Sequence, residues 1–425
     1  MSDLDSTTQK PHLVVVGLGY VGLPLAQAAV RAGYAVTGLD RSSVVVEGLN
    51  RGVSHVDDLS DSEIGDMLVR GFVATVDEGA LGQANAVVIC VPTPLAVDGS
   101  PDLLAVTSAG AAVARHLQRG TLVVLESTTA PGTTEEVLAP VLAQSGLVLG
   151  EDFFLAFSPE RVDPGNETFN ITNTPKVVGG ATPRCAAAAA EFYGRIVDTV
   201  VLAKGTREAE TAKLLENTYR HINIALVNEM ARVCHEMNID VWDVIRCAET
   251  KPFGFQAFRP GPGVGGHCIP IDPNYLSHAV KTSLGYPLRF VELAQEINQT
   301  MPAYVFRRIQ DLLNQDAVAV NGARVLVVGV TYKANIADQR ESPADALFDF
   351  LSRSGALVEF HDPMVGGWSP GGVPVPRVEA LSADEYDVAV ILQHHDAIDS
   401  DQVVKAARRI LDTRGKLDAP NVERL

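Results

Sequence analysis

The sequence has few cysteines, and none of them stands in a metal-binding or disulfide-rich pattern. Its 425 residues include five cysteines, with no C-x-x-C pair and no Cys/His array at zinc spacing. We therefore expect free thiols, a reducing cytoplasmic compartment and no bound metal. The first twelve residues are polar and acidic, unlike a signal peptide, and no apolar run reaches the roughly 18 residues of a membrane helix.

Positive charge is also scarce in this chain. Lys and Arg number 34 against 52 Asp and Glu, which gives a formal net charge of −18. Such an acidic chain does not attract nucleic acid or an anionic membrane through its overall field. An anionic small substrate would need a local cluster of basic side chains. Apolar residues make up 46% of the chain, enough to build two or three separate cores.

Short β-branched runs alternate with helical stretches over roughly the first 200 residues. This alternation predicts a parallel, doubly wound sheet. The expected strands are 12–16, 35–39, 86–91, 121–125 and 153–157, and the expected helices are 22–32, 101–117 and 133–144.

The pattern then changes to long helices and back again. Residues 206–236 contain no Gly or Pro and repeat apolar residues at helical spacing, which predicts one long helix. A second long helix is expected over 288–314, with a Gly/Pro-rich loop at 259–270 between the two. Further strands are expected at 324–328, 357–360, 388–392 and 408–411. The expected fold class is α/β, with an N-terminal Rossmann domain (1–205), a central long-helix region (206–315) and a C-terminal Rossmann-like domain (316–425).

The first glycine motif predicts a dinucleotide site. Gly17, Gly19 and Gly22 form a G-x-G-x-x-G turn between an expected strand and an expected helix. Such glycines permit the tight turn, the approach of a pyrophosphate and close helix packing. Asp40, at the end of the next strand, is placed to bind the ribose hydroxyls of NAD and to repel the extra phosphate of NADP. Arg41 beside it leaves NADP as the alternative, and a turn that serves only packing is the alternative to both.

Cys268 is the candidate nucleophile, because a thiolate attacks aldehydes well and the preceding glycines let a ligand approach. A buried structural cysteine is the alternative. Lys213 and Asn217, four residues apart on the long helix, either polarise an oxyanion or lie on a solvated face. Asp272 is either a water-activating base or a turn residue. Glu160, after an expected strand, is either a functional carboxylate or a helix cap.

Five segments together resemble the UDP-glucose/GDP-mannose dehydrogenase family along nearly the whole chain. They are GLGYVGLPLA (17–26), ESTTAPGTT (126–134), FSPERVDPG (157–165), GPGVGGHCIPIDP (261–273) and VTYKAN…DQRESP (330–343). The fourth is the most specific of these matches.

The resemblance implies an NAD-dependent, four-electron oxidation of a sugar-nucleotide alcohol to a carboxylate without release of the aldehyde. Cys268 would capture the aldehyde as a thiohemiacetal, and water would hydrolyse the thioester formed next. Lys213 and Asn217 would stabilise oxyanions, and Asp272 would help to activate water or the alcohol. Thr128 and Glu160 would position or activate the hydrolytic water.

The resemblance also assigns ligand contacts, with no metal among them. The cofactor contacts are Gly17, Gly19, Tyr20, Val21, Gly22, Asp40, Arg41, Pro92, Thr93 and Thr128. The substrate contacts are Glu160, Arg161, Lys213, Asn217, Arg259, Gly265, Lys333 and Arg340.

The substrate is expected to be UDP-GlcNAc or UDP-ManNAc, and the product a uronic acid for polysaccharide synthesis. GGHCIPID, which contains His267, is similar to the UDP-N-acetylhexosamine branch of the family, whereas UDP-glucose enzymes typically have G-G-S-C-x-P-K-D. Three features depart from the usual pattern: Arg259 replaces an aromatic residue, Gln393-His394 precedes His395 where T-D-H is usual, and STTAP (127–131) replaces the commoner S-T-V-x-P.

The apolar stripe of the long helix 206–236 predicts a homodimer or larger homo-oligomer. Three alternatives for the activity remain. They are a UDP-glucose 6-dehydrogenase, a two-electron dehydrogenase of the hydroxyacid or 6-phosphogluconate type, and an NAD-binding sensor without activity.

Overall fold

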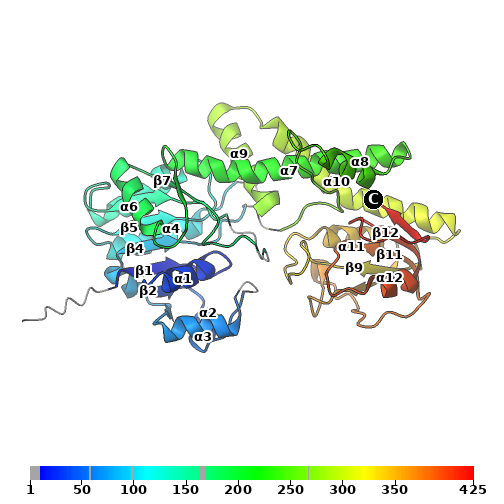
Figure 1. Cartoon of the computed structure of the whole chain (residues 1–425), viewed down its shortest axis with the longest axis horizontal. Coiled ribbons are helices and arrows are strands. Elements are labelled where there is room, and N and C mark those ends of the chain that lie inside the picture. The colour runs from blue at the N-terminus through cyan, green and yellow to red at the C-terminus, as the bar shows by residue number, and fades with distance from the viewer. Residues whose placement is uncertain (1–9, 57–58, 97–99, 162–165, 167, 267) are drawn as a thin grey trace, which may run out of the picture. The chain divides into compact units, whose positions relative to one another are not determined.

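The computed structural model describes residues 10–425 except 57–58, 97–99, 162–165, 167 and 267. The chain forms two compact units. The first contains Met1–Glu216 and Asn274–Gly285, and the second contains Asn217–Pro273 and Tyr286–Leu425. Each unit has a mainly parallel sheet of its own, which confirms the expected α/β class (Figure 1).

The sheet of the first unit has the strand order β3-β2-β1-β4-β5-β6-β7-β8. Its strands are β1 (His12–Val16), β2 (Ala35–Leu39), β3 (Val73–Thr75), β4 (Ala86–Ile89), β5 (Leu122–Leu125), β6 (Phe154–Phe157), β7 (Lys176–Gly180) and β8 (Val200–Leu202). Among the strands that the structure describes in this sheet, only β6 and β7 pair in antiparallel orientation. The five expected strands are present, whereas β3, β7 and β8 are too short or too rich in glycine to show a clear alternating pattern.

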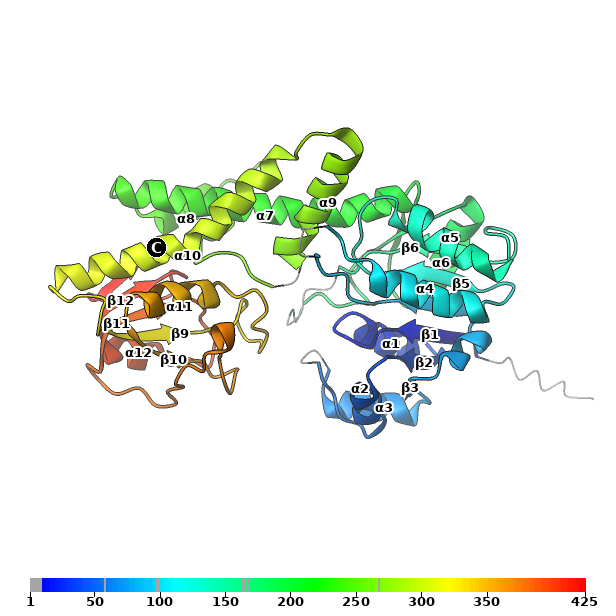
Figure 2. The same ribbon diagram turned by 180° about the vertical axis from the view of Figure 1, so that it is seen from behind.

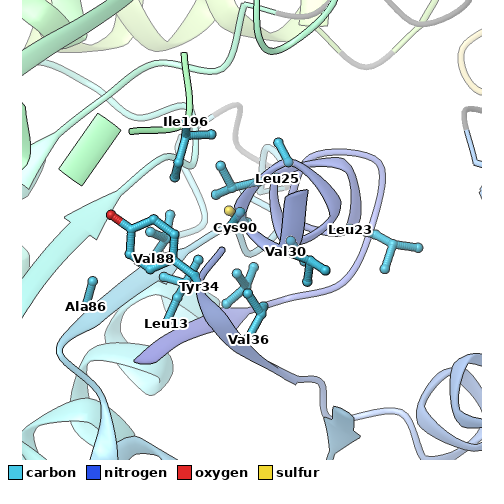
Figure 3. Close-up of a cluster of buried hydrophobic side chains, with 14 of the residues drawn as sticks. Leu13, Leu23, Leu25, Val30, Tyr34, Val36, Ala86, Val88, Cys90 and Ile196 are labelled. Atoms are coloured by element: carbon cyan, nitrogen blue, oxygen red, sulfur yellow. The ribbon is translucent and has the colours of Figure 1, made fainter. Parts of the chain in front are cut away.

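Helices cover both faces of this sheet. They are α1 (Gly22–Arg31), α2 (Ser43–Asn50), α3 (Asp61–Val69), α4 (Leu104–His116), α5 (Ala139–Leu142) and α6 (Pro183–Tyr193). Leu13 and Val15 share a core cluster with residues of α1 and α6, whereas Val14 and Val16 share another with residues of α4. This division follows from the two-residue period of a strand. Figure 3 shows part of the first cluster, where Leu13 of β1 and Leu25 of α1 are both buried.

The single helix expected over 133–144 is wrong in detail. The chain there forms a π-helical turn (Thr134–Leu138), then α5, then a 3₁₀ turn (Ala143–Ser145). Pro140 has no N–H to donate, so the regular α-helical bonding pattern cannot run through it.

Two long helices follow, and α7 (Thr206–Glu236) has the predicted bounds. The second, α10 (Arg289–Gln315), differs from the prediction by one residue at each end. Between them in the chain are α8 (Val241–Glu249) and α9 (Cys268–Leu284). The expectation that Cys268 lies in a loop is therefore wrong, because it begins α9. Pro270 is compatible with this start, since the first turn of a helix has no intrahelical use for its N–H groups.

The second unit contains an all-parallel sheet of order β10-β9-β11-β12-β13. Its strands are β9 (Arg324–Val328), β10 (Leu357–His361), β11 (Tyr386–Ile391), β12 (Ala407–Asp412) and β13 (Val422–Arg424), and its flanking helices are α11 (Pro343–Arg353) and α12 (Ser400–Ala406). Val325 and Val327 pack with α10 and α11, whereas Leu326 and Val328 pack with α12. Figure 2 shows α11 and α12 on opposite sides of this sheet. No helix of the described residues has both the length and the apolar character needed to cross a membrane.

Candidate active site

The turn from β1 into α1 has the geometry of a phosphate-binding loop. Gly17 N–H donates to Leu39 O at 2.8 Å, which ties the turn to β2. A methyl group on Gly22 would lie 1.9 Å from Gly17 O, whereas one on Gly19 would meet no heavy atom within 4 Å. Among the described residues, no side chain caps α1 and its first turn has no acidic residue. The helix N-terminus therefore presents N–H groups and a positive potential that fit a dinucleotide pyrophosphate.

Asp40 follows β2, and its carboxylate is oriented by the backbone. Oδ2 accepts the Leu18 N–H and Oδ1 accepts the Ser42 N–H, each at 2.9 Å. Each carboxylate oxygen retains a further lone pair, so the group can still accept hydrogen bonds from ribose hydroxyls. Tyr20 on the glycine loop and Arg41 beside Asp40 are both exposed. The position thus holds an oriented negative charge, which favours NAD over NADP.

Thr93 and Thr128 lie together at the carboxyl edge of the same sheet. Thr93 Oγ1 donates to Thr128 O at 2.8 Å, and Thr93 O accepts the Tyr275 hydroxyl at 2.5 Å. Pro92, which precedes this buried threonine, is exposed. Open α/β sheets bind ligands at the carboxyl ends of their strands, where the strand order reverses. Here the reversal lies between β1 and β4, next to these residues.

Glu160 and Lys213 are brought together in the first unit. Lys213 Nζ donates to Glu160 O at 2.5 Å, and Lys213 is only 9% exposed. The solvated-face alternative for Lys213 is therefore excluded. Arg161 lies next to this contact in sequence, where it pairs with Glu216 at 2.8 Å and donates to Pro175 O at 2.7 Å.

A buried ion pair at the end of β5 was not anticipated as part of the site. Lys176 Nζ lies 2.9 Å from Glu126 Oε1, and the Tyr193 hydroxyl donates to the same oxygen. All three side chains are buried. Burial lowers the pKa of Lys176, but the Glu126 and Glu160 carboxylates outweigh this effect and the pKa is raised. The available signal was Glu126 itself, a charged residue directly after a buried apolar strand.

Asn217 and Asp272 form a contact within the second unit. Asn217 Nδ2 donates to Asp272 Oδ2, and both side chains are buried. Asp272 lies four residues after Cys268, the first residue of α9. His267, which supported the substrate branch, lies outside the described residues. Cys90 is no rival nucleophile, because burial raises the pKa of its thiol well above the usual range.

The glycine-rich segment that leads to Cys268 packs against loops of the second unit. Gly261 N–H donates to Asn228 Oδ1 at 2.9 Å, and Gly266 N–H donates to Arg340 O at 3.0 Å. Gly266 has a φ of +84°, and a methyl group there would lie 2.7 Å from the Tyr332 ring. The segment before the candidate nucleophile is therefore shaped by the loop that also carries the predicted substrate contacts.

The predicted basic contacts have internal carboxylate partners. Arg340 donates from Nε and Nη2 to Asp338 Oδ2 at 3.0 and 2.6 Å, and Arg259 pairs with Glu249 at 2.8 Å. Lys333 is half-buried in the turn after β9. Within the part of the chain that the structure describes, no group of His, Cys, Asp or Glu is arranged to hold a metal ion.

Arg414 is a basic residue of this region that sequence reasoning missed. A methyl group on Gly261 would lie 2.8 Å from its Nη1, so the guanidinium borders the glycine-rich segment. Arg414 Nε donates to Leu392 O at 2.7 Å. Burial lowers the pKa of Arg414 to about 10, so the guanidinium stays charged at neutral pH. The sequence did offer a signal for Arg414: it is a basic residue that closely follows an apolar strand, where parallel sheets carry functional groups.

Comparison with known proteins finds one family along the chain. Three domain models of the UDP-glucose/GDP-mannose dehydrogenase family match this chain. The NAD binding domain matches residues 11–197, the central domain residues 207–300 and the UDP binding domain residues 326–419.

Individual relatives agree with these matches. The chain is 36% identical to UDP-N-acetyl-D-glucosamine 6-dehydrogenase of Pseudomonas aeruginosa, over 85% of this chain and 87% of that protein. It is 35% identical to NDP-N-acetyl-D-galactosaminuronic acid dehydrogenase of Ralstonia solanacearum, over 95% and 96%. The solved structure of UDP-D-ManNAc dehydrogenase from Pyrococcus horikoshii superposes with a TM-score of 0.88 at 31% identity, covering 97% of this chain and 98% of that one.

Proposed function

Because the chain belongs to the UDP-glucose/GDP-mannose dehydrogenase family, we propose that it oxidises C6 of a UDP-N-acetylhexosamine to a carboxylate with NAD. The observation that carries the proposal is the similarity to relatives named for such sugars over most of the chain. The alternative is UDP-glucose as substrate. The Asp40 carboxylate and the uncapped start of α1 supply the NAD site.

The chemistry at the alcohol is assigned to Lys213, Asn217 and Asp272. Bound NAD supplies the hydride acceptor for each of the two oxidations. An ammonium group and an amide N–H stabilise negative charge as it develops on the C6 oxygen. The Asp272 carboxylate accepts a proton from the alcohol or, later, from water. Burial of all three side chains strengthens these interactions, because water screens them less.

Cys268 is assigned the covalent step. Its thiolate adds to the aldehyde carbon, and the resulting oxyanion is protonated to a thiohemiacetal. Loss of a second hydride and of the hydroxyl proton leaves a thioester, and attack by water releases the carboxylate and the thiol. The start of α9 suits this role, since a helix N-terminus stabilises an anion. Thr128 and Glu160 are proposed to position the hydrolytic water.

Substrate recognition is assigned mainly to the second α/β domain. Lys333 and Arg340 are proposed to bind the UDP moiety, and Arg414 adds a third cation beside the glycine-rich segment. Arg161, Arg259 and Gly265 complete the proposed substrate contacts. We propose three functional regions. Residues 1–205 bind the cofactor, residues 206–315 supply the dimerisation helices and the glycine-rich segment with Cys268, and residues 316–425 bind the UDP-sugar.

Two further properties are proposed. The chain forms a homodimer, because α7 and α10 expose large apolar side chains. It works in the cytoplasm, because a catalytic thiol must remain reduced. The product is proposed to feed polysaccharide synthesis.

The test of the proposal is the amount of NADH formed per sugar. UDP-GlcNAc, UDP-ManNAc, UDP-GalNAc and UDP-glucose are supplied in limiting amount, and we expect two NADH per molecule of an N-acetylhexosamine substrate. One NADH would indicate a two-electron dehydrogenase, and none with any sugar would indicate a sensor.

Cys268→Ser should block completion of the second oxidation, since a serine hydroxyl is a far weaker nucleophile than a thiolate at neutral pH. Steady-state NADH formation should fall by roughly two orders of magnitude or more, with at most a small burst or a trapped ester. Cys247→Ser, at the exposed cysteine of α8, is the matched control. Intact-mass analysis accompanies the kinetics. Near-normal uronate formation by Cys268→Ser would contradict the covalent mechanism.

A further inference from the structure

The segment 393–396 departs from the family pattern and contacts the turn that carries Lys333. It follows β11, and the turn 331–335 follows the neighbouring parallel strand β9, so both lie at the carboxyl edge of the sheet. Gln393 Nε2 donates to Tyr332 O at 3.1 Å. Asp396 N–H donates to Asn335 Oδ1 at 2.9 Å, and Asn335 Nδ2 donates back to Asp396 Oδ2 at 2.8 Å.

His395 lies at the centre of these contacts and is fully buried. Its Nδ1 accepts the Asn335 N–H at 2.9 Å, so this nitrogen carries no proton. Nε2 therefore carries the proton and faces Asp362 Oδ2 at 3.1 Å. Asp362 is itself held by the backbone N–H groups of Val330 and Met364 at 2.7 and 2.8 Å. The hydrogen bonds thus select a neutral imidazole with one tautomer.

The turn is also closed from within. The Thr331 hydroxyl donates to Lys333 O at 2.8 Å, and His395 Nε2 lies 3.3 Å from the same hydroxyl oxygen. Asn335 adopts a φ of +63°, a left-handed conformation that asparagine tolerates better than most residues. The backbone on both sides of Lys333 is therefore bonded, directly or through Thr331, to the imidazole of His395.

The opposite side of the turn contacts the segment before the nucleophile. A methyl group on Gly265 would lie 2.7 Å from Tyr332 Cβ, and one on Gly266 would lie 2.7 Å from the Tyr332 ring. Gln393 holds the carbonyl of this same tyrosine. A shift of the turn would thus move both Lys333 and the backbone two residues before Cys268.

We propose that Gln393, His395 and Asp396 position the Lys333 turn for the diphosphate of UDP and, through Tyr332, the glycine-rich segment before Cys268. His395 acts as the positioning residue and touches neither the substrate nor the cofactor. The proposal rests on the proposed function, which places UDP in this domain. Gln393 adds a contact that is particular to this chain. Its amide donates to Tyr332 O from a position where the family pattern has threonine.

Two substitutions of His395 separate its hydrogen bonds. His395→Asn retains an acceptor near the place of Nδ1, whereas His395→Gln retains a donor near the place of Nε2 but loses the acceptor for Asn335 N–H. Loss of an acceptor leaves a buried N–H unpaired, so His395→Gln should weaken UDP binding by about tenfold and lower kcat as well. His395→Asn should recover a large part of both. His394→Gln is the matched control, because the His394 ring forms its hydrogen bond with Ser400 and not with the turn.

Binding of UDP alone is measured by calorimetry, and kcat and KM are measured with the best UDP-sugar. Equal loss in His395→Asn and His395→Gln, or normal binding in both, would overturn the inference while the wild-type activity stands. If the His395 variants do not fold, Gln393→Ala removes the bond to Tyr332 O and the 3.2 Å bond that Gln393 Oε1 accepts from the adjacent His394 N–H, and it must then lower UDP affinity and kcat together. A wild-type protein that does not bind UDP would refute the proposed function, and the inference with it.

Discussion

At the residue scale, Asp40 has both a structural and a recognition role. It accepts two backbone N–H groups that fix the glycine loop and the start of α2, and it keeps a negative charge at the end of β2. The structural role requires an acceptor oxygen for each of the two N–H groups, whereas exclusion of a 2′-phosphate requires the charge. An amide in its place removes the charge and keeps one of the two acceptor oxygens.

Asp40→Asn should reduce the preference for NAD over NADP by at least about tenfold, because the repelling charge is lost while one acceptor oxygen remains. The measurement is kcat/KM for both cofactors. Arg41→Ala is the companion variant and should leave the preference nearly unchanged. A wild-type preference for NADP, abolished by Arg41→Ala, would show that the arginine rather than the aspartate selects the cofactor.

The Glu126–Lys176 pair is a second residue-scale feature. Burial raises the pKa of Glu126, and Lys176 opposes this by favouring the ionised carboxylate. Removing one member leaves an uncompensated buried charge, so Lys176→Met should destabilise the protein by about 3–5 kcal/mol. Lys176→Met/Glu126→Gln should be less destabilised than the single variant. The measurement is the denaturant dependence of unfolding.

The exposed pair Arg195–Glu191 is the control for that experiment. Arg195→Met removes a solvated i,i+4 partner, which contributes only about 0.3–0.5 kcal/mol. If Lys176→Met cost no more than Arg195→Met, the buried pair would have no structural role.

At the element scale, α7 and α10 are joined by a buried polar network. Asn228 Nδ2 donates to Asn298 Oδ1 at 3.0 Å, and Asn298 Nδ2 donates to His221 O at 3.3 Å. Asn228 Oδ1 also accepts the Gly261 N–H, so the packing of the two helices is linked to the glycine-rich segment before Cys268. Burial lowers the pKa of His221 to about 4.

This low pKa predicts acid sensitivity. Between pH 6.5 and pH 4 the unfolded chain binds a proton at His221 that the folded chain does not bind. The free energy of unfolding should therefore fall as the pH falls through this window, by up to about 3 kcal/mol. His221→Gln should make the pH dependence of Tm shallower there, and the exposed His55→Gln should not. Parallel curves for His221→Gln and wild type would contradict this assignment.

At the scale of the whole molecule, α7 presents an apolar face that the described residues leave exposed. Tyr219, Leu226, Met230 and Val233 are each at least 40% exposed. Their spacing of three, four or seven residues places them along one side of the helix. Phe290 and Leu293 of α10 are more than half exposed. Association of two copies is the simplest way to cover such a face.

The expected mass in solution is therefore about twice the 45.2 kDa of one chain. Met230→Glu should shift the protein toward the monomer, because a charged side chain would then be buried in the proposed interface. Val44→Glu, on the exposed surface of α2, is the control. Light scattering combined with activity assays is the measurement. A fully active wild-type monomer would refute the dimer.

Local patterns in the sequence were sufficient for much of this architecture. The glycine turn at Gly17–Gly22, Asp40 after the second strand and the bounds of α7 were all predictable. Each depends on interactions within a few residues: positive φ and close packing at glycines, period-two burial in strands, and the absence of helix breakers. The prediction that Cys268 lies in a loop was wrong because it also used local composition alone. The surrounding glycines and prolines predict a loop, and only the tertiary structure shows that α9 begins at Cys268.

The tertiary structure alone decided the contacts that connect distant segments. Tyr193 reaches Glu126 across 67 residues, and His395 reaches Asp362 across 33. Neither pairing follows a helical or strand period, so no local pattern predicts it. Such pairs depend on which strands become neighbours in a sheet and on which side chains lose their water when the sheet is covered. Only the assembled sheet, by burying a charge or a ring nitrogen, determines which partner must satisfy it.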